Sequence, residues 1–356
     1  MPNQPAEVTL EVSPRARFDV IDVNERIAEN HGDLLQRYPR ALYFSYHTTA
    51  GYLEQSMAAR LNHSREGVEP FIEVFKALFP EGADYRHDQM DLRAELSEAQ
   101  KAEEPRNADS HLAYIGSGLR SCVTYLNRTG APVYFIDLDG VNQGKSRKRQ
   151  TSVIAYTREQ VAERVRLEIP VSSHPIDSVN LRDPGVGFLE QIQERVARHG
   201  LAKGRIDIAL APGERQAGLT VNEFETLLMQ HDLKEVLHDP LRFFAEKTRN
   251  ALADPRAIPS RTIEYAKYDL VRVMNRMIET LGMSESLVER LLARFMAYPA
   301  NRFLRMKRSL SLLVSDRNGE ACGELVQGTY QSPILVQWRK SERGARQVDV
   351  TLTALS

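Results

Sequence analysis

One string in this sequence joins a histidine to small hydroxyl residues at the end of a predicted strand. His47 lies in Tyr46-His47-Thr48-Thr49-Ala50-Gly51, which follows the apolar run Leu42–Tyr46. A degraded copy of the string occurs in the second half of the chain, where Glu214 aligns with His47 on a shared Ala-Gly pair. A neutral imidazole can bind a metal or move a proton. The alignment therefore predicts two related halves, of which the first has kept its histidine.

The composition is typical of a soluble globular protein, and its near-zero net charge produces no strong overall electrostatic field. The 356 residues exceed the usual size of one hydrophobic core, which predicts two domains. Charged residues make up 27% and the formal net charge is −1, so we expect neither a nucleic acid nor a membrane as partner. Cys122 and Cys322 form no C-x-x-C pair, which is typical of buried thiols in a reducing compartment.

No segment has the pattern of a targeting or membrane-spanning element. Residues 1–14 have neither a basic region nor an apolar core, so we expect no secretory signal. No apolar run approaches the roughly 20 residues that cross a bilayer. We therefore expect a soluble, cytoplasmic protein.

Strand and helix patterns alternate along the first half. In chain order they predict strands over 8–21 (interrupted at Pro14), a helix over 22–38, a strand over 42–46, helical sequence over 53–79, a helix over 110–119 and strands over 132–138 and 151–156. The last two strands flank Asp139–Gly144 and are predicted to pair as a hairpin. Residues 82–107 are charged and poor in apolar groups. This predicts a long irregular segment of the kind that serves a site or is disordered.

The second half follows the same order with one large addition. Its predicted elements are a strand over 166–171, a helix over 186–199, a strand over 205–210, a turn over 214–223, helical sequence over 262–313 and strands over 334–338 and 347–353. The last two strands are predicted to pair as a second hairpin. The helical sequence takes the place of the irregular segment of the first half. A duplicated α+β unit is the simplest account of this order.

Three motifs of the first half resemble the YjbQ-like family, also known as the secondary thiamine-phosphate synthase family. They are His47-Thr48-Thr49-Ala50, Tyr85-Arg86-His87 and Asn107-Ala108-Asp109-Ser110-His111. Two strings of the second half, Leu219–Glu223 and Gly328-Thr329-Tyr330-Gln331, resemble further family elements. The resemblance implies an α+β fold of two tandem YjbQ-like α/β sandwich domains with antiparallel sheets. One would span 1–158, and a degenerate one would span 159–356 with a helical insertion over 255–313.

The resemblance also implies chemistry, although the two halves divide the family's motifs between them. Family members are small trimers whose conserved histidines look like metal ligands, and a weak thiamine-phosphate synthase activity is attached to them. Here the first half lacks the family's Asn-Glu pair and its G-T-W-Q segment, and the second half lacks all three histidines. A single site assembled from both halves is the hypothesis that follows.

His47, His87 and His111 are the candidate metal ligands. Three neutral imidazoles with an open fourth position suit zinc, which lowers the pKa of a water molecule to about 7. Other divalent metals that accept nitrogen ligands also suit this set. Taken singly, most histidines are better explained as hydrogen-bonded residues of the core or surface. The metal hypothesis therefore rests on the three motifs together.

The other motif residues each allow a chemical and a structural interpretation. Asp109 is either an acid/base group, or a carboxylate that orients an imidazole, or the N-terminal cap of the next helix. Glu223 is either a base or a partner in a helix capping box. Arg86 is either a bidentate clamp for a phosphate or carboxylate or a solvated side chain. The candidate substrate-binding residues are Thr48, Thr49, Asn107, Thr329 and Gln331.

These residues predict a metal-dependent enzyme that acts on a small polar metabolite, phosphorylated metabolites included. Transfer, lyase and hydrolytic steps all remain open, and we expect a homo-oligomer. The alternative is a non-catalytic, metal- or ligand-binding assembly protein. The basic run Lys145–Arg149 could touch phosphates, but in a chain of near-zero net charge it is better explained as a solvated hairpin tip.

Overall fold

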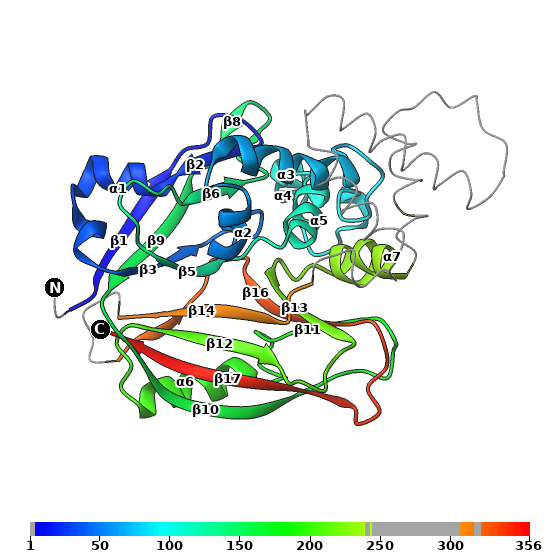
Figure 1. Ribbon diagram of the computed structural model, residues 1–356. Coiled ribbons are helices and arrows are strands. Elements are labelled where there is room, and N and C mark those ends of the chain that lie inside the picture. Colours follow the sequence, from blue (N-terminus) through cyan, green and yellow to red (C-terminus); the bar gives the residue numbers. More distant parts are fainter. Residues whose placement is uncertain (1–3, 239–242, 244–305, 317–321) are drawn as a thin grey trace. The chain divides into compact units, whose positions relative to one another are not determined.

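Every sheet in the described part of the chain is antiparallel, and helices connect or cover the sheets, so the fold is α+β (Figure 1). The structure is a computed structural model that describes residues 4–238, 243, 306–316 and 322–356. The chain divides into two compact units. The first unit comprises residues 1–68, 118–224 and 306–356, and the second comprises residues 69–117 and 225–305.

The first half of the chain contributes two sheets to the first unit. The larger sheet has the order β1-β9-β3-β5, formed by Ala6–Val12, Arg149–Tyr156, Arg40–Ser45 and Cys122–Leu126. The smaller sheet has the order β2-β6-β4, formed by Asp19–Asp22, Tyr134–Asp137 and Ala50–Gly51. The segment from Tyr46 to Thr49 joins β3 to β4, so the histidine string carries the chain from one sheet to the other.

The second half contributes two sheets of matching order. The larger is β10-β17-β12-β14-β15, formed by Glu159–Pro170, Ala345–Leu355, Gly204–Leu210, Ser309–Ser315 and Glu324–Val326. The smaller is β11-β16-β13, formed by Asp177–Asn180, Ser332–Gln337 and Ala217–Asn222. Apart from the added edge strand β15, each strand has a counterpart at the same place in the first half. The domain boundary at residue 158 and the duplication itself stay predictions.

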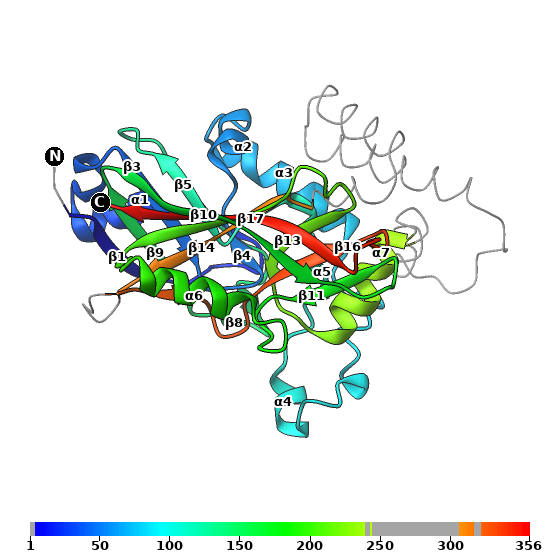
Figure 2. The ribbon, with the colours of Figure 1, turned by 90° about the horizontal axis from the view of Figure 1, so that it is seen from below.

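Strand alternation arranges these sheets in layers within the first unit (Figures 1 and 2). Successive side chains of a strand point to opposite faces. Ala41 and Tyr43 of β3 pack with α1 (Val23–His31), whereas Leu42 and Phe44 pack against the larger sheet of the second half through Leu313 and Leu355. The opposite face of that sheet is covered by α6 (Phe188–Arg198). The layer order is therefore helix, sheet, sheet, helix.

The helices begin where local signals place them. The Asp22 carboxylate accepts hydrogen bonds from the N–H groups of Asn24 at 2.9 Å and Glu25 at 3.3 Å, and so caps α1. Val23 and Ile27, one helical turn apart, then point into the core. α6 follows the same logic, because its buried residues repeat at helical spacing; they are Phe188, Leu189, Ile192 and Val196.

The second unit is built from two chain segments that follow β4 and β13, strands at corresponding places in the two halves. After β4, α2 (Gln55–Arg60) and the first turn of α3 (Arg65–Leu78) still belong to the first unit. The rest of α3, the 3-10 turn η2 (Met90–Leu92), α4 (Glu98–Glu103) and α5 (Ala108–Ser117) belong to the second unit. After β13 come the π-helical turn η3 (Leu228–Asp232) and α7 (Leu233–His238). Of the segment predicted to be irregular, 82–107, only η2 and α4 are helical.

Two predicted hairpins are wrong. The strands over 132–138 and 151–156 do not pair with each other: β6 pairs with β2 and β4, while β9 pairs with β1 and β3. In the second half, β16 likewise pairs with β11 and β13, while β17 pairs with β10 and β12. The hairpin between β6 and β9 is the short pair β7 (Val141–Asn142) and β8 (Lys145–Ser146). The turn residues Asp139–Gly144 therefore do mark a hairpin, but the hairpin is the short β7–β8 pair.

The predicted helical sequence over 262–313 is also wrong at its end. Residues from Ser309 onward form β14, because Leu310 and Leu312 alternate with two serines and bury one face. The remainder of the predicted insertion, from 255 to 305, lies outside the described residues. β5 was not predicted from the sequence at all.

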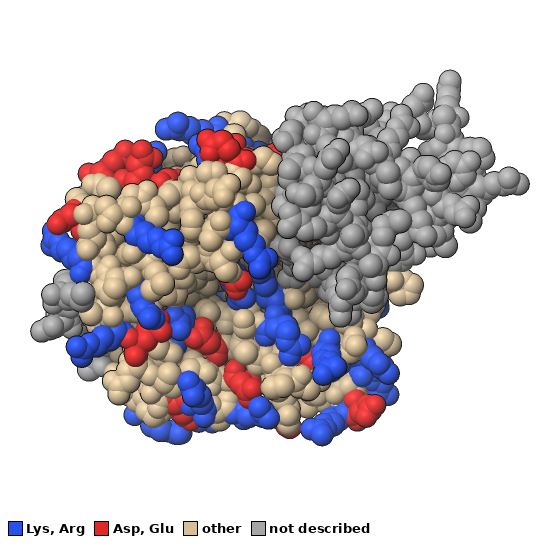
Figure 3. Space-filling view, viewed as in Figure 1, with Lys and Arg blue, Asp and Glu red and all other residues tan. Residues whose placement is uncertain are grey.

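Among the described residues, no helix is both long and apolar enough to span a membrane. On the face shown in Figure 3, acidic and basic side chains of the described residues are interspersed, in keeping with the net charge of −1.

Candidate metal centre

A carboxylate distant in sequence fixes the backbone around His87. The N–H groups of Arg86 and His87 donate to the two oxygens of Asp232 at 2.9 and 3.0 Å. Asp232 is fully buried at the end of η3. A buried carboxylate needs such hydrogen bonds to offset its desolvation. The turn that carries His87 is thereby held in place.

A second carboxylate orients the His87 ring. Nδ1 of His87 lies 2.9 Å from Oδ1 of Asp88, and the same oxygen accepts the N–H of Ala108 at 3.1 Å. The carboxylate acceptor assigns the ring proton to Nδ1 and leaves the lone pair on Nε2. Metal-binding histidines are commonly oriented by a carboxylate in this way. Asp88 also ties the ring to the start of α5, the helix that carries the second histidine.

His111 lies in α5 beside His87. Its N–H donates to the carbonyl of Asn107 at 3.1 Å, so it lies in the first turn of the helix. The two imidazole rings are 5.4 Å apart between centroids and tilted by 55°. His87 is 0% exposed and His111 1% exposed. Two buried imidazoles from separate motifs therefore face one another within the second unit.

The two imidazoles form the candidate centre within the second unit. Imidazole nitrogens are common zinc ligands at about 2.0–2.1 Å from the ion, and one of these two rings is already oriented by a carboxylate. The two histidines therefore fit a divalent metal that takes its other ligands from further groups. Glu223 follows β13 in the first unit, where its N–H donates to the Asn222 side chain at 2.8 Å. Its part in the site stays a prediction.

The remaining predicted residues of the second unit take different positions. Asp109 is the second residue of α5 and is 8% exposed, so it is not the helix cap. Its carboxylate accepts a hydrogen bond from the Ser110 hydroxyl at 3.4 Å. Asn107 is buried, and its carbonyl accepts the N–H groups of Ser110 and His111. Arg86 is exposed; its backbone N–H donates to Asp232, and its carbonyl accepts the N–H of Gln89 at 3.1 Å.

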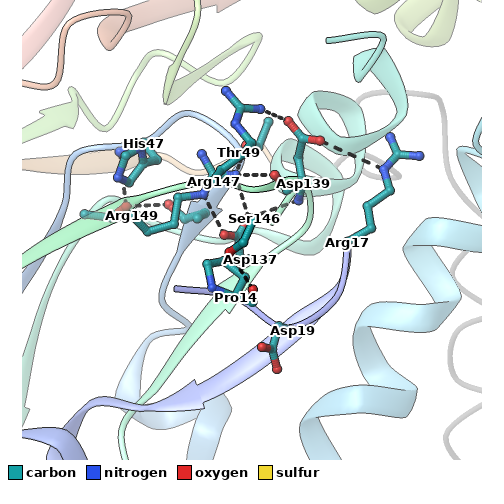
Figure 4. A network of polar contacts seen from close by, with 12 residues as sticks. Pro14, Arg17, Asp19, His47, Thr49, Asp137, Asp139, Ser146, Arg147 and Arg149 are labelled. Atoms are coloured by element: carbon teal, nitrogen blue, oxygen red, sulfur yellow. Dashed lines mark hydrogen bonds and ion pairs between the residues drawn. The ribbon is translucent and has the colours of Figure 1, made fainter. Parts of the chain in front are cut away.

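In the first unit, the third predicted ligand, His47, lies beside a buried arginine (Figure 4). Arg149 pairs with Asp137 through Nε at 2.6 Å and Nη2 at 2.8 Å, and both side chains are buried. Nη2 also donates to Thr49 Oγ1 at 3.3 Å and to the Asp139 carbonyl at 2.6 Å. Burial raises the pKa of Asp137, and Arg149 opposes that shift. This ion pair is the centre of the network.

His47 is neutral in this network. Its Nε2 accepts the N–H of Gln150 at 2.7 Å. Burial, followed by the nearby charges of Arg149 and Arg147, lowers the pKa of His47 to about 3. One of the two ring nitrogens that could bind a metal, Nε2, is thus occupied by a backbone hydrogen bond. Ligation by His47 stays a prediction.

The second half has a corresponding network, in which the carboxylate stands at the position of His47 and a neutral residue stands at the position of Asp137. The Glu214 carboxylate takes the place of His47, since its Oε1 accepts the N–H of Gln347 at 3.1 Å. Its Oε2 accepts from Arg346, the counterpart of Arg149, at 2.8 Å. Gln337 stands at the register position of Asp137, because Ala50 pairs with Asp137 and Ala217 with Gln337.

Each half therefore has one buried arginine paired with one carboxylate, but the carboxylate comes from a different element. Arg149 pairs with Asp137 of the small sheet, whereas Arg346 pairs with Glu214 of the segment between β12 and β13.

Of the predicted substrate-binding residues of the second half, Gln331 contacts the backbone of the segment between β3 and β4. Gln331 is 1% exposed, and its amide donates to the carbonyls of Ser45 and His47, each at 2.8 Å. Its Oε1 accepts the N–H of Gly328 at 2.9 Å. A Cβ on Gly328 would stand 1.8 Å from the Tyr46 carbonyl, so only glycine fits there. The Gly328–Gln331 segment thus packs against the backbone of the histidine string and hydrogen-bonds to it.

Thr48 and Thr49 are buried, whereas Thr329 is exposed and offers its carbonyl to Arg182. Substrate binding by these threonines is untested and stays a prediction.

Sequence reasoning missed the carboxylates that hold the histidines. Asp88 follows His87 directly and could have been noticed as a partner. Asp232 could not, because it is 145 positions away from His87. Glu225 was also missed: its two oxygens accept the N–H groups of Leu227 and Leu228 at 2.8 and 2.7 Å. It caps the helical turns after β13, a role that had been considered for Glu223.

No family model and no curated protein match this sequence. Several solved structures do. A YbjQ-like protein of unknown function from Sulfolobus solfataricus is 18% identical, with 55% of this chain and 99% of that chain covered and a TM-score of 0.29. A hypothetical protein from Aeropyrum pernix is 13% identical over 53% of this chain and 97% of that chain, with a TM-score of 0.27.

An uncharacterised conserved protein of the YjbQ/UPF0047 family from Clostridium acetobutylicum is 13% identical, with 53% of this chain and 98% of that chain covered and a TM-score of 0.26. Each of these three matches covers little more than half of this chain.

Proposed function

We propose that this protein is a metal-dependent enzyme whose metal is held by His87 and His111. The observation that carries the proposal is the pair of facing, buried imidazoles, of which one is already oriented by a carboxylate. Zinc suits imidazole ligands well. When bound, such an ion acts as a Lewis acid toward a carbonyl or phosphoryl oxygen and acidifies a water molecule.

Other residues of the chain would orient a metal ligand and transfer protons. Asp88 keeps the His87 proton on Nδ1 and so keeps Nε2 available to the metal. Asp109, buried in the first turn of the same helix as His111, is the proposed acid/base group. The low exposure of both histidines keeps bulk water from the site, which strengthens electrostatic interactions within it.

The substrate class in this proposal is a small polar metabolite. Phosphorylated metabolites are included, and the reaction is a transfer, a lyase step or a hydrolysis. The family resemblance makes thiamine-phosphate synthesis the first transfer reaction to assay. A homo-oligomer and a cytoplasmic location belong to the same proposal.

A second candidate is a non-catalytic metal site. Structural metal sites are closed to solvent, and the near-complete burial of both histidines favours this alternative. Under it, the metal would stabilise the second unit without turnover.

The test compares zinc-loaded and chelator-treated full-length protein against a panel of small phosphorylated and unphosphorylated metabolites. Thermal shift identifies compounds that bind, since a ligand stabilises the native state by mass action, and product analysis of those compounds follows. The enzyme proposal predicts turnover that zinc restores after chelation and that His111→Ala abolishes. Binding and turnover that chelation leaves unchanged would refute it, and zinc binding without any turnover would favour the structural alternative.

A further inference from the structure

Strand β10 in the first unit has one open edge. It is the outermost strand of the larger sheet of the second half, and among the described strands it pairs with β17 alone (Figures 1 and 2). The N–H of Val171 donates to the carbonyl of Gly344 at 3.0 Å and so continues this ladder beyond the end of the strand. Hydrogen-bonded and non-hydrogen-bonded pairs alternate along an antiparallel ladder. The odd-numbered residues from 163 to 171 therefore bond toward β17, and the backbone groups of the even-numbered ones point away from the sheet.

Charged side chains line this open edge. They belong to Arg164, Arg166 and Glu168, which are all exposed and whose N–H and carbonyl groups point outward. The alternate residues Leu167 and Ile169 are buried in the core that α6 covers, so the three charged side chains lie on the opposite face of the sheet. Outward backbone groups on an edge strand can pair with a strand of another chain.

Another edge strand of the same unit shows how such groups are otherwise covered. On β5, the side chain of Gln55 donates to the carbonyl of Leu126 and accepts the N–H of the same residue, each at 3.0 Å. Among the residues that the structure describes, no side chain bonds in this way to the outward groups of β10 between residues 164 and 168. The edge of β10 is therefore open over this stretch.

The signs of the edge charges decide whether two copies can pair, because like charges directly opposite one another are unfavourable. In an antiparallel pairing about a two-fold axis at Arg166, Arg164 stands opposite the partner's Glu168, and the same pair recurs on the other side of the axis. Arg166 would face the partner's Arg166. Its guanidinium, however, already bonds to Asp349 at 2.7 and 3.0 Å, so two neutralised pairs meet at the axis.

The two ends of the open stretch also suit this pairing. At one end the register with β17 shifts between Val161 and Glu163, which marks a β-bulge. At the other end Pro170 has no N–H to donate. The pairing about residue 166 puts Pro170 opposite the partner's Ala162, within the bulge, where the ladder is already interrupted. Val161, which is 45% exposed, then lies against the far end of the partner's strand.

We propose that β10 pairs along its open edge with β10 of a second copy of this chain, which joins two five-stranded sheets into one continuous sheet. A two-fold interface uses the same surface on both subunits and closes at two, so the assembly is a dimer. The inference rests on the proposed function only for its homo-oligomer, to which it gives an interface. It uses no residue of the metal centre.

The test measures the dissociation constant of the dimer by sedimentation velocity of the full-length, chelator-treated protein over a range of concentrations. Arg164→Glu and Glu168→Arg each put like charges opposite one another on both sides of the axis, so each should raise the dissociation constant about tenfold. The double variant Arg164→Glu/Glu168→Arg restores opposite charges and should return to within about threefold of wild type. Glu194→Arg, on an exposed position of α6, is the control and should dimerise like wild type.

Arg166→Pro removes an outward N–H and leaves the ladder to β17 intact, so it should fold and remain monomeric. Circular dichroism checks its fold, and the charge-exchange series decides the matter if it does not fold. A wild-type protein that is monomeric or trimeric, or a dimer that none of the edge variants weakens, would overturn the proposal. Zinc binding measured on the same variants should equal that of wild type, so failure of this interface and failure of the metal centre are read separately.

Discussion

Asp88 is the residue that makes His87 a directed ligand and not merely a buried imidazole. One oxygen of Asp88 accepts hydrogen bonds from the Nδ1–H group of His87 and from the N–H of Ala108, so ring and helix are oriented together. Carboxylates that orient metal-binding histidines usually contribute 10- to 100-fold to metal affinity, a range we adopt as an order-of-magnitude estimate.

Asp88→Ala should therefore weaken zinc binding by about 10- to 100-fold while leaving both imidazoles present. Competition with a coloured chelator measures the zinc affinity. Asp91→Ala, three positions along on an exposed turn, is the control and should bind zinc like wild type. Unchanged affinity in the Asp88 variant would show that this carboxylate has no part in metal binding.

His47 makes the stability of the fold depend on pH. Its pKa is about 3 in the folded protein and about 6.5 in an unfolded chain. Between these values the unfolded state binds the extra proton, so the stabilisation is complete above about pH 6.5 and is lost as the pH falls toward 3. The loss between pH 6.5 and 4.5 should amount to about 2 kcal/mol.

His47→Gln keeps an acceptor for Gln150 but does not titrate, so its free energy of unfolding should fall by about 2 kcal/mol less than that of wild type over the same pH range. Urea denaturation in the presence of a chelator measures both proteins at the two pH values. Parallel pH profiles would mean that His47 is already solvated and titrates normally in the fold.

At the scale of elements, the Gly328–Gln331 segment supports the connection between β3 and β4. The side-chain amide of Gln331 donates hydrogen bonds to the carbonyls of Ser45 and His47, and its Oε1 accepts one from the N–H of Gly328. Leaving such buried groups unsatisfied costs about 1–3 kcal/mol for each group. We therefore interpret this motif as structural, although the sequence had suggested substrate binding.

Gln331→Met should lower the free energy of unfolding by about 3 kcal/mol, because it leaves three buried backbone groups without their partner. Tyr330→Ala, one residue earlier and 70% exposed, should change it by less than about 0.5 kcal/mol. Chemical denaturation compares the two. A neutral Gln331→Met variant would reopen the question of a ligand-binding role for this side chain.

The sequence predicted elements well where periodicity alone decides them. Helix α6 and strand β12 fall within two residues of the predicted ranges, because apolar spacing and flanking glycines mark both. Strand pairing was harder. β6 and β9 have strand patterns, but nothing local shows that each joins a different sheet. β14 was assigned to a helix because the preceding sequence is helical in pattern and its own Ser-Leu alternation is short.

At the scale of the whole molecule, the candidate site depends on long-range contacts that a sequence reveals only in part. The motifs pointed to His87 and His111, and the structure brings their rings together. Asp232, which fixes the His87 backbone from 145 positions away, had no detectable signal. The aligned pair His47 and Glu214 was visible in the sequence, yet only the hydrogen bonds show that both accept an equivalent backbone N–H.

The most direct measurement is the metal content of the purified full-length protein after zinc loading and dialysis, combined with X-ray absorption at the zinc edge. The account predicts one bound zinc per chain, with a coordination shell that contains two imidazoles and oxygen donors. It also predicts loss of that zinc in His87→Ala and His111→Ala, and retention in His174→Ala, whose side chain is exposed. A wild-type protein that retains no zinc, or histidine variants that keep it, would contradict the account.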